Sequence, residues 1–295
     1  MKKLNSLFLL LFLAISGFAQ ETEEVKKVTY PAGYSAQIDV VYAKVKDWNG
    51  RMDLYLTPKE KGPSPIVINI HGGGWNHGTK ESQTGFSSFF KKDYAVANVE
   101  YRLVDVAPAP AAIEDVRCAL IYIISHAKEL NVDVNKIVIM GSSAGGHLAL
   151  MGGLLANNPI FDTNCKTNQQ IKVAAIIDKY GIADVWDWGY GKDLTSKSAT
   201  RWLGTKAKDE NFAKSVSPMS YVAKSSPPTF IVHGDADPTV PYQQSVKLYK
   251  AFQDSGVKSE FMTIEGGKHG GFPKEQNSEL NKRIMEFLKG LGISN

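Results

Sequence analysis

Two kinds of apolar pattern predict strands in this chain. Residues 37–45 and 52–57 alternate apolar and polar side chains, and Trp48-Asn49-Gly50 lies between them. This arrangement predicts an antiparallel hairpin with its turn at those three residues. Six later segments are short and almost wholly apolar, which is typical of strands covered on both faces: residues 66–70, 94–99, 136–140, 173–177, 229–232 and 261–264.

Helical patterns fall between these apolar runs. Residues 110–127 carry apolar side chains at steps of three and four, with Pro110 at the start of the segment. Further helices are expected over residues 144–156, 243–252 and 278–288. The alternation of strand and helix predicts the α/β class, with a mostly parallel, twisted sheet that opens with the antiparallel hairpin and carries helices on both faces.

The connection between the runs at residues 173–177 and 229–232 is unusually long and aromatic. Ligands of open α/β sheets bind beyond the carboxyl ends of the strands, so this insertion, at about residues 181–225, is a candidate substrate wall. We find no internal repeat and expect residues 20–295 to form a single domain. The aromatic residues of the insertion include Trp186, Trp188, Tyr190, Trp202 and Tyr221.

The first nineteen residues predict a secretory signal peptide. Two lysines precede an apolar run over residues 7–15, and small residues follow up to Ala19, where we expect cleavage. The run is too short to span a bilayer comfortably, and no later segment approaches the ~20 apolar residues of a spanning helix. We therefore expect an exported protein without a membrane span, located in the periplasm or outside the cell.

Composition narrows the picture further. The chain has 295 residues, of which 43% are apolar and 22% charged, as in ordinary globular proteins. Loss of the two leader lysines lowers the net charge from +4 to +2, so no nucleic-acid partner is expected. Cys118 lies in an apolar helical pattern that favours a buried free thiol, although an oxidising compartment would permit a bridge to Cys165.

A Gly-x-Ser-x-Gly motif follows one of the apolar runs. Residues 136–140 lead into Gly141-Ser142-Ser143-Ala144-Gly145, where a helix is expected to begin. A strand that turns abruptly into a helix holds a serine in strained backbone with its hydroxyl projecting, whereas the motif alone would also fit a helix-capping turn. Only Ser143 has glycines two positions to either side, so Ser143 is the candidate nucleophile.

A serine nucleophile needs a base, usually an imidazole that a carboxylate orients. In folds with a strand–serine–helix arrangement the chain order is serine, acid, histidine, which leaves His147, His233 and His269. We expect His147 to pack within the serine's own helix, and His233 ends a buried strand. His269, in a glycine-rich loop after the last apolar run, is therefore the candidate base.

Two further loops carry the remaining groups. Asp235 and Asp237 both follow the run at residues 229–232, and their spacing does not decide which one is the acid. His71-Gly72-Gly73-Gly74-Trp75 follows the run at residues 66–70, and its glycines let backbone N–H groups face a ligand closely, as an oxyanion hole requires. A phosphate cradle is the alternative, but no Gly-Lys-Ser/Thr follows.

The blocks HGGGW, GSSAG, HGDADPTVP and GGKHGGF resemble those of serine esterases of the α/β-hydrolase superfamily. They are most similar to bacterial acetyl and feruloyl esterases related to the hormone-sensitive-lipase group. The resemblance covers the chain from about residue 35 and implies the α/β-hydrolase fold. It also implies that Asp237 is the triad acid, that Asp235 is a turn residue, and that the N–H groups of Gly73, Gly74 and Ala144 are the oxyanion donors.

Other features of this group bear on the shape of the site. Asp115 and Asp184 match positions that resemble structural carboxylates of the family. Members with a large N-terminal helical cap need many residues before the first strand, and here only residues 20–36 are available. The resemblance therefore implies an open site, walled mainly by the aromatic insertion.

The resemblance implies an exported serine carboxylesterase that hydrolyses short acyl or feruloyl esters of small molecules or plant-polysaccharide fragments, without metal or cofactor. The candidate substrate-binding residues are Trp75, Trp186, Trp188 and Tyr190, although those of the insertion could equally pack its interior. The alternatives on the same fold are a prolyl-oligopeptidase-like peptidase, a lipase and a non-catalytic carbohydrate-binding protein.

Overall fold

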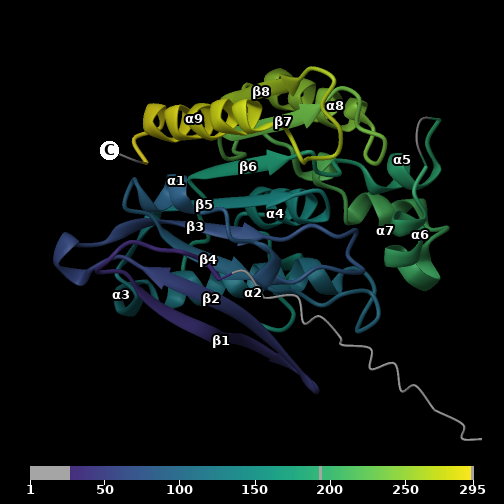
Figure 1. Ribbon diagram of the computed structural model, residues 1–295. Helices are drawn as coiled ribbons and strands as arrows, with labels where there is room; N and C mark the ends of the chain where they lie inside the picture. The colour runs from purple at the N-terminus through teal and green to yellow at the C-terminus, as the bar shows by residue number, and fades with distance from the viewer. Residues whose placement is uncertain (1–26, 193–194, 294–295) are drawn as a thin grey trace, which may run out of the picture.

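The computed structural model describes residues 27–192 and 195–293, and the expected signal peptide lies outside them. Within these described residues, eight strands form one sheet in the order β1-β2-β4-β3-β5-β6-β7-β8 (Figure 1). The pairs β1–β2 and β2–β4 are antiparallel and all the other pairs are parallel. The strands are β1 Ser35–Val45, β2 Trp48–Leu56, β3 Ser64–Ile70, β4 Ala95–Val99, β5 Val132–Ser142, β6 Ala175–Lys179, β7 Thr229–Gly234 and β8 Ser259–Ile264.

The N-terminal hairpin forms, but its turn lies earlier than the sequence predicts. Trp48 already pairs with Val45, so the chain reverses at Lys46 and the residue after it. Lys46 takes a φ of +52°, in the left-handed region that short hairpin turns use. Gly50 is needed for a different reason, because a Cβ there would lie 2.6 Å from the ring of Tyr42.

Helices cover both faces of the sheet, as the apolar runs predict. Along β3, Ile66 and Ile68 face the core beneath α2, α4 and α8, whereas Val67 faces the core beneath α1 and α9. A strand buried on both faces therefore needs apolar residues at every position. The α-helices are α1 Ser87–Phe90, α2 Ala111–Ser125, α3 Ala127–Leu130, α4 Ala144–Leu154, α5 Val185–Tyr190, α6 Lys197–Leu203, α7 Glu210–Ser215, α8 Tyr242–Asp254 and α9 Lys274–Gly290.

The insertion between β6 and β7 gathers beyond the carboxyl ends of the strands, where α5, α6 and α7 lie together (Figure 1). Asp184 caps α5 by accepting the backbone N–H of Asp187 at 2.9 Å. Gln244 of α8 accepts the N–H groups of Ala183 and Asp184 at 3.0 and 2.8 Å, which ties the start of the insertion to the main domain. Short 3₁₀ helices complete the described residues: η1 Lys59–Lys61, η2 Lys80–Ser82, η3 Pro159–Phe161, η4 Gly204–Lys206 and η5 Pro218–Tyr221.

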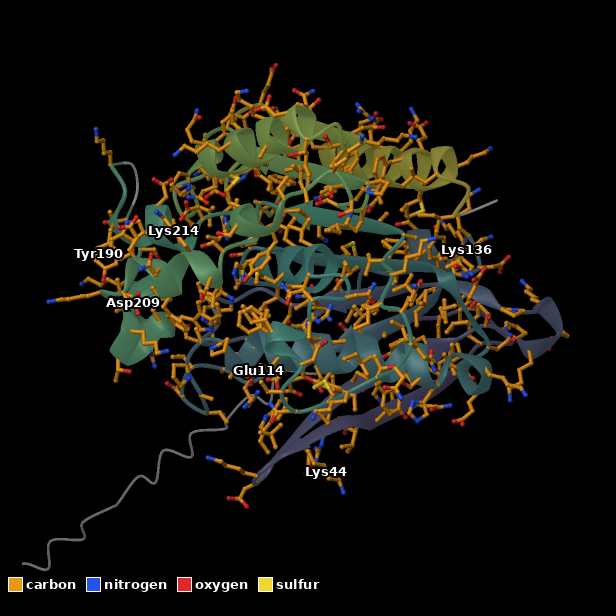
Figure 2. All side chains as sticks on the ribbon, turned by 180° about the vertical axis from the view of Figure 1, so that it is seen from behind. Lys44, Glu114, Lys136, Tyr190, Asp209 and Lys214 are labelled. Carbon is orange, nitrogen blue, oxygen red and sulfur yellow. A yellow bond between two sulfur atoms is a disulfide. The ribbon has the colours of Figure 1, made fainter. Side chains whose placement is uncertain are left out.

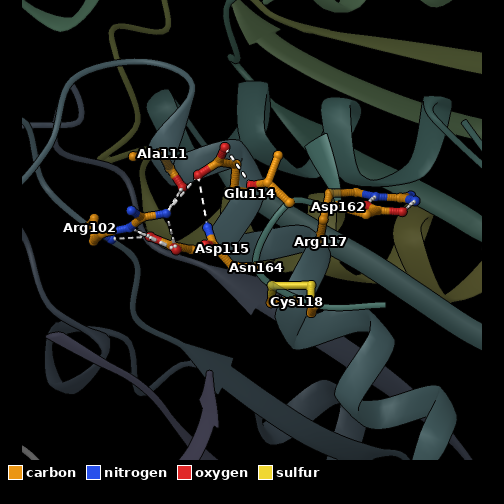
Figure 3. Close-up of a disulfide and its surroundings, with 10 residues drawn as sticks. Arg102, Ala111, Glu114, Asp115, Arg117, Cys118, Asp162 and Asn164 are labelled. Atoms are coloured by element: carbon orange, nitrogen blue, oxygen red, sulfur yellow. Dashed lines mark hydrogen bonds and ion pairs between the residues drawn. A yellow bond between two sulfur atoms is a disulfide. The ribbon is translucent and has the colours of Figure 1, made fainter. Parts of the chain in front are cut away.

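Cys118 and Cys165 form a disulfide, with an S–S distance of 2.09 Å, which corrects the expectation of a free thiol (Figure 3). Cys118 is buried in α2, as its apolar surroundings indicate. The helical pattern does not indicate which loop packs on α2. In the structure, the loop that carries Cys165 packs there. Within the described residues, no helix is both long and apolar enough to cross a bilayer.

Candidate active site

Ser143 lies on the turn that joins β5 to α4. It has φ +56° and ψ −124°, a strained conformation for a residue with a side chain. Its N–H donates to the carbonyl of Lys179 on β6 at 2.9 Å, and its carbonyl accepts the N–H of His147 at 3.0 Å. These two bonds fix the turn, which presents the Ser143 hydroxyl to a pocket at the carboxyl edge of the sheet.

The glycines on either side of Ser143 are required by close backbone contacts. A Cβ on Gly141 would lie 2.1 Å from the carbonyl oxygen of Gly145. A Cβ on Gly145 would lie 2.2 Å from the carbonyl oxygen of Ile70, on the neighbouring strand. The motif therefore has a steric cause: strand and helix meet too closely for any side chain at these positions.

Loops after two adjacent strands bring an imidazole and a carboxylate to the serine. Nε2 of His269 lies 2.8 Å from Oγ of Ser143, and Nδ1 of His269 lies 2.6 Å from Oδ2 of Asp237. The partners fit a ring that donates Nδ1–H to the carboxylate and accepts the hydroxyl proton at Nε2. Asp235 instead accepts the N–H of Gly266 at 2.7 Å in an exposed turn, away from the imidazole.

The carboxylate of Asp237 has four hydrogen-bond donors. Oδ1 accepts the N–H groups of Thr239 and Val240 at 2.7 and 3.1 Å. Oδ2 accepts from His269 and also from Nε2 of His233, which lies at 3.0 Å. Burial raises the pKa of Asp237, but the donors from both imidazoles and from Thr239 outweigh it and hold this pKa well below its usual range.

The sequence did not predict this role for His233. Its ring is fully buried at the end of β7, and Nδ1 accepts the hydroxyl of Ser245 on α8 at 2.7 Å. Nε2 faces only acceptors, the carboxylate of Asp237 and the carbonyl of Val240 at 3.1 Å, so Nε2 carries the proton and donates to Asp237. The available signal was the position of His233, four residues before Asp237. A histidine at the end of a strand can contact a carboxylate in the turn that follows that strand.

The loop after β3 faces Ser143 with unused N–H groups. Gly73 and Gly74 have φ values of +114° and +56°, and a Cβ on Gly73 would lie 2.0 Å from the carbonyl oxygen of His77. Among the described residues, the N–H groups of Gly73, Gly74 and Ala144 have no backbone acceptor. Ala144 is the first residue of α4, where N–H groups point out of the helix. Three donors are thus available near the serine hydroxyl.

His71 supports this loop from behind. Its ring stacks on Tyr101 with centroids 4.3 Å apart, and the Tyr101 hydroxyl donates to the His71 carbonyl at 3.1 Å. Nδ1 of His71 lies 2.7 Å from the carbonyl of Gly72. Burial lowers the pKa of His71 to about 4, so the ring is neutral at physiological pH and does not compete as a base.

The pocket around Ser143 has a volume of about 540 Å³ and a wall that combines apolar surface with hydroxyl and amide side chains. Tyr180 and Trp188 are aromatic residues of the pocket lining. Tyr180 packs edge-on against the His269 ring, with centroids 4.9 Å apart. Besides Ser143 and Tyr180, the side chains that line the pocket with a hydroxyl or an amide belong to Ser82, Gln83, Ser142, Ser196, Ser198 and Thr239. Such a wall suits a ligand that has both apolar and hydroxylated parts.

The four aromatic residues expected to contact substrate divide into three groups. Trp188 lines the pocket. Trp186 and Tyr190 instead pack on each other, with centroids 4.4 Å apart, and Figure 2 shows Tyr190 at the outer edge of the molecule. Trp75 has no exposed surface, so the expectation that it touches substrate directly is corrected: its ring lies behind the glycine loop.

The conformation of Trp75 has a cost. With φ +59°, this bulky residue occupies the left-handed region, at a cost of about 1–2 kcal/mol. Three aromatic rings contact it, those of Trp202, Trp188 and His147. Each aromatic pair contributes about 0.5–1.5 kcal/mol beyond the burial of its area, so together these contacts are large enough to hold the strained backbone.

Two buried carboxyls, those of Asp115 and Asp178, accept hydrogen bonds from nearby groups of the protein. Asp115 accepts the backbone N–H and the guanidinium of Arg102 at 2.7 and 2.9 Å. Asp178 on β6 accepts the N–H of Gly181 at 3.0 Å through Oδ1, and its Oδ2 has no partner among the described residues. Burial raises the pKa of Asp178 to about 7.

Comparison with known proteins places the chain in a family. Residues 52–252 match the family model of BD-FAE. The chain is 26% identical over 222 residues to the esterase LipC of Mycobacterium tuberculosis, covering 70% of this chain and 53% of LipC. It is 30% identical over 203 residues to the probable carboxylic ester hydrolase LipM of the same organism, covering 66% of this chain and 45% of LipM. The chain thus spans about half the length of the curated relatives it matches.

Solved structures match a larger share of the fold. A truncated carbohydrate esterase from gut microbiota superposes with a TM-score of 0.77 at 26% identity, covering 88% of this chain and 99% of that one. The propionate-bound esterase Est2 of Thermogutta terrifontis gives a TM-score of 0.71 at 26% identity, covering 89% and 96%. The fold is therefore that of the α/β hydrolases, as the sequence predicts.

Proposed function

The chain belongs to the BD-FAE family, and from this membership and the geometry of its pocket we propose that it is a serine carboxylesterase. The observation that carries the proposal is the series of contacts from Ser143 through His269 to Asp237, next to three free N–H groups. A hydroxyl, a neutral imidazole and an ionised carboxylate in this order are the parts that acyl transfer requires. Several relatives of the chain are named as esterases.

The reaction proceeds in two steps. His269 takes the proton of Ser143 as Oγ attacks the ester carbonyl, and the carboxylate of Asp237 stabilises the imidazolium that forms. The N–H groups of Gly73, Gly74 and Ala144 bind the oxyanion. His269 then gives its proton to the departing alcohol, which leaves an acyl-serine. In the second step His269 activates a water that releases the acid and restores Ser143.

The proposed substrates are short acyl or feruloyl esters of plant-polysaccharide fragments. The hydroxyl and amide side chains of the lining support a hydroxylated alcohol group, and the open shape of the pocket supports a bulky one. The similar carbohydrate esterase from gut microbiota and the Est2 structures with propionate and butyrate point in the same direction. Of the aromatic residues proposed to contact substrate, Trp188 belongs to the lining with only 2% of its surface exposed, and Trp186 and Tyr190 lie outside the lining.

Export of the protein is part of the proposal. It rests on the signal-peptide pattern of the first nineteen residues, with cleavage after Ala19. The Cys118–Cys165 disulfide supports it, because such bonds persist in oxidising compartments. Fractionation of cells that express the full chain, with N-terminal sequencing of the product, tests this directly: a cytoplasmic product that begins at Met1 would contradict export.

A substrate panel tests the activity and its specificity together. Acetylated xylan, methyl ferulate and p-nitrophenyl acetate are compared at equal enzyme concentration, and we expect the first or the second to be cleaved along with the simple ester. Cleavage of long-chain triglycerides but of none of these esters would indicate a lipase. Cleavage of dipeptide amides alone would indicate a prolyl-oligopeptidase-like peptidase.

A further inference from the structure

Trp75 directly follows the two glycines whose N–H groups we assign to the oxyanion hole. Its left-handed backbone persists only where surrounding contacts hold it. The carbonyl of Trp75 accepts the N–H of Val104 at 2.8 Å, and its indole ring is fully enclosed. Whatever fixes the position of this ring therefore also fixes the backbone of Gly73 and Gly74.

The main contact of that ring is Trp202 of α6, in the insertion. The two indoles are nearly parallel, at 13°, with centroids 4.3 Å apart. Both rings are fully buried, and within the described part of the chain neither indole N–H has a hydrogen-bond partner. Stacking, rather than hydrogen bonding, therefore sets how the rings lie against each other. The carbonyl of Trp202 accepts the N–H of Ala109 at 2.8 Å, which anchors α6 to the main domain.

Two more rings connect this stacked pair to the rest of the site. His147, one turn after Ser143 on α4, meets Trp75 and Trp202 edge-on, with centroids 5.0 and 5.1 Å away. Trp188 meets Trp75 at 5.7 Å and donates its indole N–H to the carbonyl of Thr239 at 3.0 Å. We call these four residues the aromatic cluster. The cluster contacts the glycine loop, the helix of the serine and the loop that follows Asp237.

We propose that Trp202 is a positioning residue for the esterase reaction: by stacking on Trp75 it holds the N–H groups of Gly73 and Gly74 toward the oxyanion. Trp202 is enclosed behind the pocket lining and acts through Trp75. The inference rests on the proposed function. In this account the aromatic insertion contributes to the chemical step, because preorganised N–H donors stabilise the transition state more than they stabilise the bound substrate.

The test compares Trp202→Leu, which keeps an apolar side chain without a flat ring, with Trp202→Phe, which keeps a stacking ring. Tyr190→Ala is the matched control, since Tyr190 is an exposed aromatic residue of the same insertion. For Trp202→Leu we expect kcat for p-nitrophenyl acetate to fall about 10–100-fold, less than loss of a whole oxyanion donor costs, with KM within about threefold. Trp202→Phe and Tyr190→Ala keep kcat within about threefold of the native value.

Inhibition by a trifluoromethyl ketone separates positioning from mere packing. This probe adds to a serine hydroxyl and forms a bound oxyanion, so its inhibition constant should rise in Trp202→Leu by the factor that kcat/KM falls. A lower melting temperature with native kcat and native inhibition would overturn the inference, as would equal losses in the Leu and Phe variants. If Trp202→Leu does not fold, Trp202→Met takes its place with the same expectations.

Failure of the proposed function gives a different result. In that case the native protein neither hydrolyses the ester nor binds the trifluoromethyl ketone. Failure of the present inference leaves the native protein fully active, and the variants at Trp202 then either match it or lose activity equally.

Discussion

Two long connections of the chain are attached to the domain by different chemistry. Residues 155–174, between α4 and β6, are attached to α2 by the Cys118–Cys165 disulfide and by the ion pair of Arg117 with Asp162, at 2.7 Å (Figure 3). Residues 180–228, between β6 and β7, contain no cysteine and are attached mainly through buried aromatic rings.

The two connections therefore differ in what they support: the first supports the stability of the fold, and the second supports the catalytic site. Among the described residues, none between 155 and 174 lines the pocket, so their attachment to α2 stabilises the fold without contacting the site. The rings of the second connection contact the glycine loop and the helix of Ser143. Loosening the first connection should therefore lower the free energy of unfolding, and loosening the second should lower kcat.

The largest expected effect comes from a change that touches neither connection. Ser143→Ala removes the proposed nucleophile and should lower kcat about 10⁵–10⁶-fold while leaving the melting temperature nearly unchanged, by analogy with other triad knockouts. Ser142→Ala is the matched control and should retain most of the activity, because the hydroxyl that lies 2.8 Å from Nε2 of His269 is that of Ser143. Ester hydrolysis by Ser143→Ala above a tenth of the native rate would contradict the assignment.

Removal of the disulfide tests the first connection. Replacing Cys118 and Cys165 together by Ala frees a loop with a sequence separation of 47 residues, which should lower the free energy of unfolding by about 4 kcal/mol. Assayed well below its melting temperature, the double variant should keep kcat/KM within about twofold of the native value. A tenfold loss of kcat/KM in a folded double variant would show that this connection also supports the site.

His233→Phe tests the buried donor behind Asp237. The substitution keeps a ring of similar size but removes one of the donors to the carboxylate. A hydrogen bond to a charged group contributes about 1.5–3 kcal/mol, so kcat should fall about 10–100-fold while KM changes little. The control Ser245→Ala, which leaves Nε2 in place, should have a smaller effect. A native kcat in His233→Phe would mean that His269 and the backbone donors suffice to fix Asp237.

The prediction with the smallest effect on activity concerns pH and the buried carboxyl of Asp178. With a pKa of about 7, it holds a proton in the native state that the unfolded chain releases near pH 4. Its contribution to stability is therefore present at low pH and is lost as the pH rises through 7. Asp178→Asn, which cannot ionise, should gain stability relative to the native chain between about pH 4 and 7, by up to about 1.4 kcal/mol per pH unit, and the difference should level off above pH 7. Parallel melting curves at all pH values would contradict this.

The motifs of the sequence lead to the fold and to the main groups of the site because each has a local physical cause. The glycines around Ser143 are required because a Cβ there would lie about 2 Å from a backbone oxygen. The apolar runs are required because both faces of these strands are buried. Partners that come from distant segments carry no such local signal. The bond of His233 to Asp237, the stacking of Trp202 on Trp75 and the disulfide all depend on how separate elements pack, which spacing along the chain does not encode.

The most direct test of the account is to find the residue that a fluorophosphonate labels in the native protein. Such a probe reacts with a serine whose hydroxyl an imidazole activates and whose adduct an oxyanion hole stabilises. We predict one phosphonyl group per chain, on the peptide that contains Ser143 and at that residue, with no label in Ser143→Ala. Labelling at Ser142 or elsewhere, or equal labelling of Ser143→Ala, would contradict it.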